Sequence, residues 1–177
     1  IRGIPASPTP RRAVVFASNI TTATDMLSAF RAAQFRAELV TGDTLDDVKW
    51  MAFDGLEAGT VDVIVAVDVI SEGTDFPALE VAIMARATAS IIVFRQQLGR
   101  VLRPLMTPQY AAARTREERR AAIAASPKPI AYLIDHVGNF TRHGPPDRPR
   151  AWSLESTRGG RGKSDAIQYR ACLNVPD

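Results

Sequence analysis

The residues best suited to chemistry in this sequence form the segment Gln96-Gln97-Leu98-Gly99-Arg100-Val101-Leu102-Arg103. Four of them have the i, i+3, i+4 and i+7 spacing of one helix face: Gln96, Gly99, Arg100 and Arg103. Two guanidinium groups one turn apart can bind an anion with several oxygens, such as a phosphoryl group. Gly99 leaves room for another surface to approach closely. A solvated basic helix face is the plainer alternative, and it stays open at this point.

A second stretch that could bind a ligand runs from Asp68 to Pro77 and follows the most β-branched apolar run of the chain. Open α/β sheets bind ligands outside the carboxyl ends of their strands, which is where this stretch would lie. Gly73 permits a tight backbone turn, and the Asp75 carboxylate could accept hydrogen bonds from ribose hydroxyls. The alternative is an ordinary strand-to-helix turn, because glycine and proline are common turn residues.

Both stretches belong to a chain in which predicted strands and helices alternate. We expect strands at 13–17, 37–40, 62–67, 81–84 and 130–134, and helices after Ser18 or Asn19, from Thr44 to Gly59, from Ser90 to Leu102 and from Arg114 to Ala125. The first strand, at 13–17, is a short, continuous apolar run, which is typical of a strand buried on both faces. The βαβ spacing of the strands and helices predicts a parallel α/β sheet.

The second helix has the clearest local signals. Thr44 and Asp47 predict a capping box at its start, and Gly59 predicts its end. Its expected apolar stripe consists of Val48, Met51, Ala52 and Leu56.

Composition indicates one main globular domain. The chain has 177 residues, 46% of them hydrophobic and 23% charged. We expect a lead-in at 1–11, the domain at 12–149 and a flexible tail at 150–177, the whole being a fragment of a longer protein. Of the 22 basic residues only three are lysines: Lys49, Lys128 and Lys163. The arginine excess suits phosphate contacts, and a compositional bias of the source genome explains it equally well. A single cysteine, Cys172, fits a reducing cytoplasm, and no apolar run approaches the ~20 residues of a membrane span.

Three weaker motifs do not predict sites. Gly162-Lys163-Ser164 ends like a phosphate-binding loop, but Thr157 stands where that motif needs its first glycine. Asp135 and His136 lack a nucleophile elbow, so a structural role is expected for them. Cys172 has too few partner ligands in this sequence for a zinc site.

Taken together, the motifs resemble those of the C-terminal RecA-like lobe of superfamily 2 (DEAD/DEAH-type) helicases. Residues 65–77 resemble motif V of that family, and 96–103 match its motif VI, Gln-x-x-Gly-Arg-x-x-Arg. Residues 14–18 are similar to motif IV, and Val40-Thr41-Gly42 to the strand-end motif that follows. Residues 85–90, 134–139, 142–144 and 152–155 are similar to bacterial RadD-type and related phage or restriction-type DNA helicases.

This resemblance implies a RecA-like parallel β-sheet sandwiched between helices, in the C-terminal lobe of an ATP-dependent DNA helicase or translocase with a role in DNA repair. ATP and Mg²⁺ would bind mainly to an N-terminal RecA-like lobe, whose motifs are absent here. Arg100 would be the arginine finger, with Arg103 beside it and Gln96 orienting the site. The nucleotide-contacting residues would include Gly73, Asp75 and Gly99.

The nucleic-acid contacts implied by the resemblance involve Ser18, Asn19, Thr41, Gly42 and Asp68, which would follow the DNA backbone without reading its sequence. No resident metal is expected here, although Cys172 could be the first ligand of a zinc module that continues past Asp177. We expect this chain alone to be inactive as an ATPase. The competing hypothesis is a non-catalytic α/β module that binds nucleic acid or a partner protein.

Overall fold

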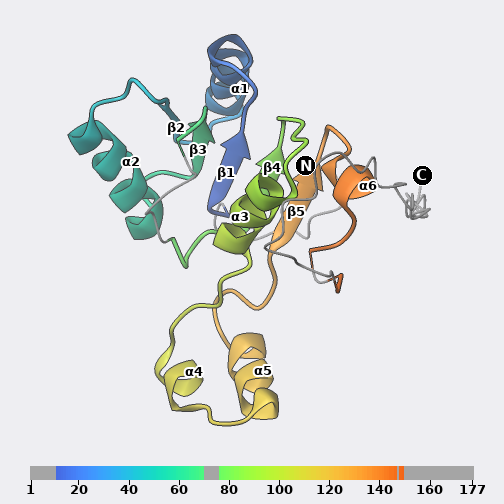
Figure 1. Ribbon diagram of the computed structural model, residues 1–177. Coiled ribbons are helices and arrows are strands. Elements are labelled where there is room, and N and C mark those ends of the chain that lie inside the picture. The colour runs from blue at the N-terminus through green and yellow to red at the C-terminus, as the bar shows by residue number, and fades with distance from the viewer. Residues whose placement is uncertain (1–10, 70–75, 147, 150–177) are drawn as a thin grey trace, which may run out of the picture.

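The structure, a computed structural model, describes residues 11–69, 76–146 and 148–149. In these ranges the chain forms a five-stranded sheet with the strand order β2-β3-β1-β4-β5 (Figure 1). The strands are β1 (Ala13–Phe16), β2 (Ala37–Val40), β3 (Val63–Ala66), β4 (Val81–Met84) and β5 (Tyr132–Asp135). Every pairing is parallel, which confirms the expected parallel α/β sheet.

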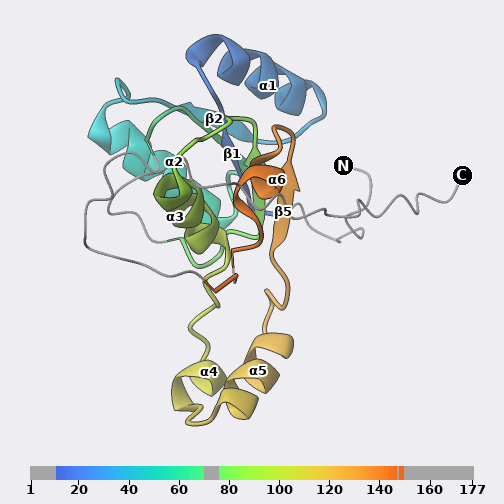
Figure 2. The same ribbon diagram turned by 45° about the vertical axis from the view of Figure 1, so that its right-hand side comes forward.

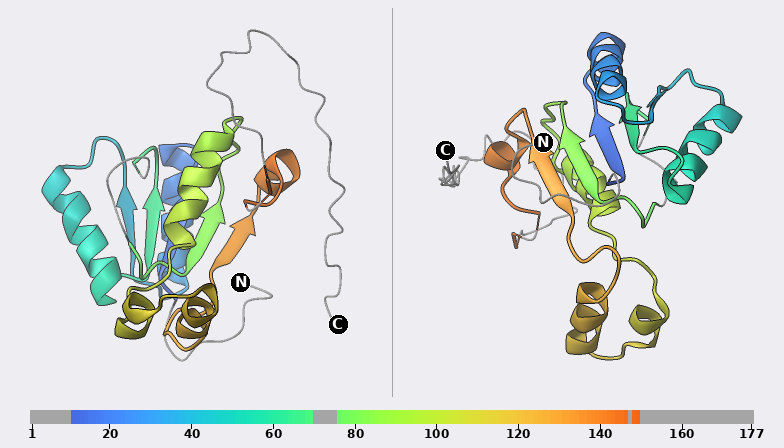
Figure 3. Two further views of the ribbon diagram at one scale, coloured as in Figure 1. Left: turned by 60° about the horizontal axis from the view of Figure 1, so that its bottom comes forward. Right: turned by 180° about the vertical axis from the view of Figure 1, so that it is seen from behind.

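Helices cover both faces of this sheet. Helix α1 (Ile20–Ala32) packs on one face, whereas α2 (Asp46–Ala58), α3 (Ile91–Val101) and the short α6 (Asn139–His143) pack on the other (Figure 3). Two further helices, α4 (Pro108–Ala112) and α5 (Arg116–Ala124), connect α3 to β5 and project beyond the sheet (Figure 1). We call this pair the α4–α5 hairpin.

The central strand β1 shows how the sequence builds two cores. Its alternate residues Val14 and Phe16 join the core under α2 and α3, and Ala13 and Val15 join the core under α1. All four are buried, as the continuous apolar run predicts. In the register of the sheet Phe16 lies beside Ala66 and Met84, so the loops that follow these strands leave from one edge.

The start of α1 is fixed by one of its two predicted caps. The Asn19 side chain accepts a hydrogen bond from the Thr22 amide at 2.9 Å, and Ser18 does not cap the helix. The Asn19 cap therefore places the first turn of α1 directly after β1, within the loop that the resemblance assigns to nucleic acid.

The predicted capping box of α2 is wrong. Leu45 occupies the N-cap position and makes no side-chain cap. The Thr44 hydroxyl instead accepts from the Thr41 amide at 2.9 Å, so it closes the turn after β2 rather than starting the helix. Gly59 ends α2 in the left-handed conformation (φ 77°), as predicted.

The predicted apolar stripe of α2 is half right. Ala52 and Leu56 are buried, but the third buried member is Phe53. Val48 and Met51 are 49% and 72% exposed. The helix is rotated because Phe53 stacks on Phe76 with ring centroids 4.4 Å apart, and this aromatic contact takes the place expected for Met51.

The last strand begins later than predicted. Pro129 has no N–H to donate to a neighbouring strand, and Ile130 is 58% exposed. The first ladder bond runs from the Tyr132 amide to the Glu80 carbonyl at 2.8 Å. The helix expected at 114–125 begins at Arg116, and the sequence analysis did not predict α4 or α6.

The beginning of β3 is tied to the loop before β2 by a buried carboxylate. Asp62 accepts hydrogen bonds from the backbone amide of Arg36 at 2.9 Å and from its Nε at 3.0 Å. The Arg36 guanidinium holds the pKa of Asp62 below its ordinary value, against the opposing effect of burial.

Three predictions for the remainder of the chain stay untested. The domain edge near Pro149, the segment Gly162-Lys163-Ser164 and Cys172 all involve residues outside the described ranges. Among the helices of the described residues, none is long and apolar enough to cross a membrane.

We expect Asp62→Asn to destabilise the protein by about 1.5–3 kcal/mol at pH 7, because an amide cannot replace a carboxylate that accepts from a charged donor. Since the folded-state pKa of Asp62 is lowered, its contribution is complete above the ordinary value of 3.8 and is lost as the pH falls through the folded value. Urea unfolding from pH 6 to pH 2.5 should show the difference between wild type and variant shrinking at low pH. Asp54→Asn, on the exposed side of α2, is the matched control. A difference that does not change with pH would contradict the assignment.

Candidate functional site

Helix α3 presents the arginine-bearing segment. Ser90 caps it by accepting from the Val93 amide at 3.3 Å. Its buried side chains, Phe94, Gln97, Leu98 and Val101, face the sheet. This orientation turns Gln96 and Gly99 outward and leaves Arg100 half-buried.

The side chain of Arg100 is not tied to the described lobe. Within the part of the chain that the structure describes, its side chain has no hydrogen bond or ion pair. Beside it, a Cβ built on Gly99 would meet no atom within 4 Å. Nothing in the described lobe therefore requires a glycine at this position, and the surface in front of Arg100 is open to another body.

The fourth member of the predicted face lies past the helix. α3 ends at Val101 with Leu102 as its C-cap, so Arg103 does not continue the helical spacing. Its position is instead set from a distance: the Arg103 carbonyl accepts from the Nζ of Lys128 at 2.7 Å. The i+7 spacing thus predicted a helical face that extends past the end of α3.

Lys128 holds two segments of the site at once. Its Nζ also donates to the Pro77 carbonyl at 2.8 Å, at the end of the stretch that follows β3. The side chain is buried, and burial lowers the pKa of Lys128 to about 8. A buried ammonium thus links the chain after α3 to the chain before β4.

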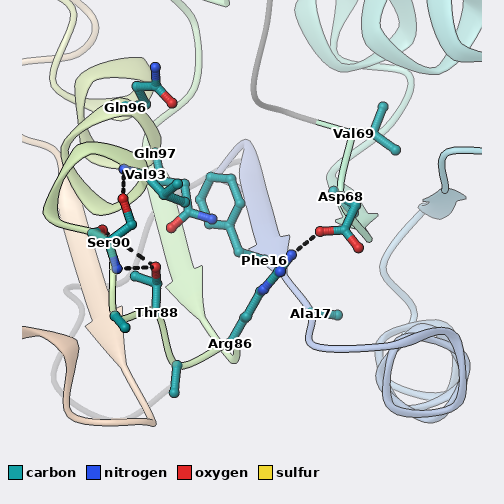
Figure 4. Close-up of a pocket in the computed structure, with 13 residues that line it drawn as sticks. Phe16, Ala17, Asp68, Val69, Arg86, Thr88, Ser90, Val93, Gln96 and Gln97 are labelled. Atoms are coloured by element: carbon teal, nitrogen blue, oxygen red, sulfur yellow. Dashed lines mark hydrogen bonds and ion pairs between the residues drawn. The ribbon is translucent and has the colours of Figure 1, made fainter.

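A cavity of about 440 Å³ opens at the carboxyl edge of the sheet, beside the first turns of α3 (Figure 4). Asp68, which follows β3, and Arg86, which follows β4, form an ion pair across it. Asp68 has a left-handed backbone (φ 57°), which aspartate tolerates better than most residues. The pair neutralises the Asp68 carboxylate beside the cavity, so a phosphate could approach Arg86 there.

One wall of the cavity carries a polar group without a partner. The Oε1 of Gln97 is buried and, among the described residues, accepts no hydrogen bond. An unpaired buried acceptor lowers stability by about 1–3 kcal/mol. This unpaired acceptor therefore lowers the stability of the structure next to the cavity, because Gln97 lines it.

The loop between β4 and α3 is held by α6. Asn139, fully buried, accepts from the Thr88 amide at 3.0 Å and donates to the Arg86 carbonyl at 2.9 Å. The Nε2 of His143 donates to the Thr88 carbonyl at 2.8 Å, and its ring stacks on Phe94. These contacts fix the loop that carries Arg86 and leads into α3.

Asp135 stabilises the turn that leads into α6. Its carboxylate accepts from the amides of Val137 at 3.2 Å and Phe140 at 2.7 Å. This arrangement gives Asp135 the structural role expected from the sequence. His136 is exposed, and its amide continues the sheet by donating to Met84.

The residues predicted to contact nucleic acid gather at the carboxyl edge, because they follow the parallel strands β1, β2 and β3: Ser18, Asn19, Thr41, Gly42 and Asp68. Two of them are already engaged. The Asn19 side chain caps α1, and the Thr41 amide donates to Thr44. Ser18 and Gly42 are exposed.

Two predicted nucleotide contacts, Gly73 and Asp75, lie outside the described residues. The sequence analysis assigned no role to four residues that the structure places at the site: Arg86, Thr88, Lys128 and Asn139. Lys128 had a usable signal, since it is one of only three lysines and stands between two prolines. In the described ranges, no three His, Cys, Asp or Glu residues are grouped so that they could hold a metal ion.

Comparison with known proteins supplies a family. Residues 4–104 match the sequence pattern described as "Helicase conserved C-terminal domain". A 51.5 kDa protein of Lactococcus phage (isolate 7-9) is 27% identical over 165 residues, which cover 92% of this chain. The alignment covers 32% of the phage protein, so the chain spans about a third of this curated relative's length.

Solved structures share the fold. The E. coli DEAD-box protein SrmB, in a complex with regulator of ribonuclease activity A, superposes with a TM-score of 0.53 at 19% identity, over 73% of this chain and 62% of that one. The C-terminal domain of the DEAD-box protein Dbp5 gives 0.52 at 12% identity, over 74% and 64%. The yeast DEAD-box splicing factor Prp28 gives 0.52 at 12% identity, over 72% and 23%. These likenesses confirm the expected RecA-like α/β fold.

We expect Lys128→Met to destabilise the protein by about 1–3 kcal/mol at pH 7, because the carbonyls of Pro77 and Arg103 lose a charged donor. The pH dependence is a sharper test. With a folded-state pKa of about 8 against an ordinary 10.5, the unfolded chain binds more protons between these values, so wild-type stability rises with pH there. Urea unfolding at pH 7–10 should therefore show the gap between wild type and Lys128→Met widening. Lys49→Met controls for the loss of a lysine, and a gap that narrows with pH would refute the assignment.

Proposed function

The chain belongs to the helicase conserved C-terminal domain family, and from that premise we propose that it is the C-terminal lobe of an ATP-dependent DNA helicase or translocase. Its partner in this proposal is an N-terminal RecA-like lobe of the same protein, which holds ATP and Mg²⁺. The lobe described here contributes the arginine finger and part of the nucleic-acid track. It works in the cytoplasm, in line with the single cysteine of the sequence.

The observation that carries the proposal is the state of Arg100. Its guanidinium is half-buried on α3 and, within the described residues, has neither a hydrogen bond nor an ion pair. An arginine that served the fold would be paired there, whereas one that serves a second lobe must be free to reach it. The open space over Gly99 would admit the nucleotide-bearing surface.

In the proposed mechanism Arg100 stabilises charge that develops on the transferred γ-phosphoryl group. Such a finger increases the rate by about 10³–10⁵. Arg103 lies beside it, where Lys128 fixes its carbonyl, and Gln96 helps to orient the site. Gly73 and Asp75, which lie outside the described residues, would contact the nucleotide's sugar.

The proposed nucleic-acid track is the carboxyl edge of the sheet. Exposed backbone at Ser18 and Gly42 would contact phosphates, and the Asp68–Arg86 pair would offer a guanidinium next to a neutralised carboxylate. Contacts of this kind position a strand without reading its bases. Asn19 and Thr41 would act through the loop conformations that they fix.

Within the family, we place the chain near RadD-type and phage or restriction-type DNA helicases, and we propose a role in DNA repair. The phage relative supports this placement, since it aligns along 92% of the chain. Asn139 and His143 support it too. Both belong to the segments 134–139 and 142–144 that carry the resemblance, and both form hydrogen bonds with Thr88 in the β4–α3 loop.

In a protein that contains both lobes, Arg100→Ala should reduce nucleic-acid-stimulated ATP turnover by about 10³-fold or more, while the apparent affinity for ATP changes much less. The reason is that the finger acts mainly on the transition state. Arg100→Lys should restore little activity, because an ammonium cannot reproduce the planar fork. Steady-state kinetics with circular dichroism of each variant make the measurement.

Arg142→Gln, on the exposed side of α6, is the matched control and should leave turnover unchanged. Parental ATP turnover in a folded Arg100→Ala protein would favour the non-catalytic module instead. An unfolded variant would show that Arg100 serves the fold.

The 177-residue chain alone should bind ATP more weakly than micromolar, because the sequence contains no complete phosphate-binding loop. Titration calorimetry with Mg²⁺ and ATP measures this affinity. A micromolar dissociation constant for the isolated chain would mean that this lobe has a nucleotide site of its own, in conflict with the proposed division of labour.

A further inference from the structure

We propose that the α4–α5 hairpin is a second nucleic-acid-binding surface, which contacts the phosphate backbone through the arginines of α5. This inference rests on the proposed function for its class of ligand, but on different residues. It concerns a part of the chain that neither the family match at 4–104 nor the predicted site residues include.

The hairpin carries basic side chains that the fold does not use. Four arginines lie in or next to α5, and all are exposed: Arg114, Arg116, Arg119 and Arg120. None of these guanidinium groups has an ion pair or hydrogen bond within the described residues. By contrast, Arg11, Arg31 and Arg36 all pair with carboxylates.

The three arginines inside α5 share one face. Arg116, Arg119 and Arg120 stand at i, i+3 and i+4, where Cβ atoms are about 5–6 Å apart. Ala122 is the buried residue of this helix, so α5 turns a small side chain inward and the arginines outward. The result is a compact row of guanidinium groups.

Neither acidic residue of α5 forms an ion pair with this row among the described residues: Glu117, three residues before Arg120, has no ion pair, and Glu118 is engaged elsewhere. Glu118 completes a capping box with Thr115, and its carboxylate accepts from the amides of Arg114 at 2.6 Å and Thr115 at 3.1 Å. These bonds hold the pKa of Glu118 below its ordinary value. The Glu118 carboxylate is therefore directed at the helix start, and the three guanidinium groups outnumber the one exposed carboxylate, Glu117, that remains on α5.

The hairpin stands apart from the carboxyl edge of the sheet. Because α3 runs antiparallel to the strands, it ends at their amino edge, and the hairpin extends from there (Figures 1 and 2). α4 and α5 pack on one another. A ligand on α5 would thus make a contact separate from the one proposed at Ser18 and Gly42.

The chemistry of the row favours phosphate over an acidic protein. Guanidinium groups bind phosphate oxygens through paired, planar hydrogen bonds, and a nucleic-acid backbone offers such groups at regular intervals. Protein interfaces usually depend on a buried aromatic or apolar anchor, whereas α5 carries no aromatic residue. Arginines without an aromatic anchor suit a contact that is electrostatic and independent of sequence.

The test is fluorescence anisotropy of the 177-residue chain with a labelled 20-base-pair DNA duplex of arbitrary sequence, at several salt concentrations. The triple variant Arg116→Gln, Arg119→Gln, Arg120→Gln keeps good helix formers and removes three charges. We expect its dissociation constant to rise by about tenfold or more at low salt. The slope of log K against log salt should become shallower by about 2–3, since each lost duplex phosphate contact contributes about 0.9.

The single variants Arg116→Gln, Arg119→Gln and Arg120→Gln are each compared with Arg142→Gln on α6, which removes one positive charge as they do. Each α5 variant should weaken DNA binding more than Arg142→Gln does. Circular dichroism checks that the hairpin stays helical. Equal affinity and salt slope for wild type and triple variant would overturn the proposal, as would an equal effect of Arg142→Gln. Failure of the proposed function would appear separately, as unchanged ATP turnover in Arg100→Ala.

Discussion

The double burial of β1 is the constraint on which the rest of this structure depends. The strand is hydrogen-bonded on both edges, to β3 and β4, and covered by helices on both faces. Each of its four residues must therefore be apolar and must fit a fixed space. Because β3 and β4 take their register from it, the loops after all three strands leave the sheet at one level. The candidate cavity exists only because those three strand ends coincide.

The short strands alone would not hold the long connecting loops in place. Hydrogen bonds between segments that are distant in the sequence do so. Lys128 joins carbonyls at 77 and 103, and Asn139 joins positions 86 and 88. Both side chains are buried, where hydrogen bonds face little competition from water and an unmade bond is costly. The segments that the proposed function uses are thus held by residues far away in the sequence. Rigidity of this kind suits the proposed role of Arg100, which requires its guanidinium group to be presented to a second lobe.

The sequence predicted the elements whose signal is local. Mostly apolar segments identified the first four strands, and the spacing after Ser90 identified α3, which leaves Gln96 exposed and Arg100 half-buried. Errors arose where tertiary contacts decide. Thr44 was predicted to cap α2, but its hydroxyl accepts a hydrogen bond from the Thr41 amide in the preceding turn. Met51 was predicted to be in the core, but Phe53 is buried there instead, stacked on Phe76, which is distant in the sequence.

At the site, the same division holds. The motif spacing led to Arg100, since family motifs and helix periodicity are both visible in one sequence. The ion pair between Asp68 and Arg86 was not predicted, because it depends on the neighbouring positions of two strand ends. The burial of Lys128 was not predicted either, although its place between two prolines is visible in the sequence.

The bond between Lys128 and the Arg103 carbonyl has a further consequence for how such a lobe can diversify. Arg103 and Lys128 lie on either side of the segment that contains α4 and α5, so this bond holds the two ends of that segment together next to the sheet. The entropy of closing a loop grows only slowly with its length, so residues could be added or removed between these two ends at small energetic cost. The segment that contains α4 and α5 could therefore be exchanged, and the lobe could acquire a new surface there without a change in its core.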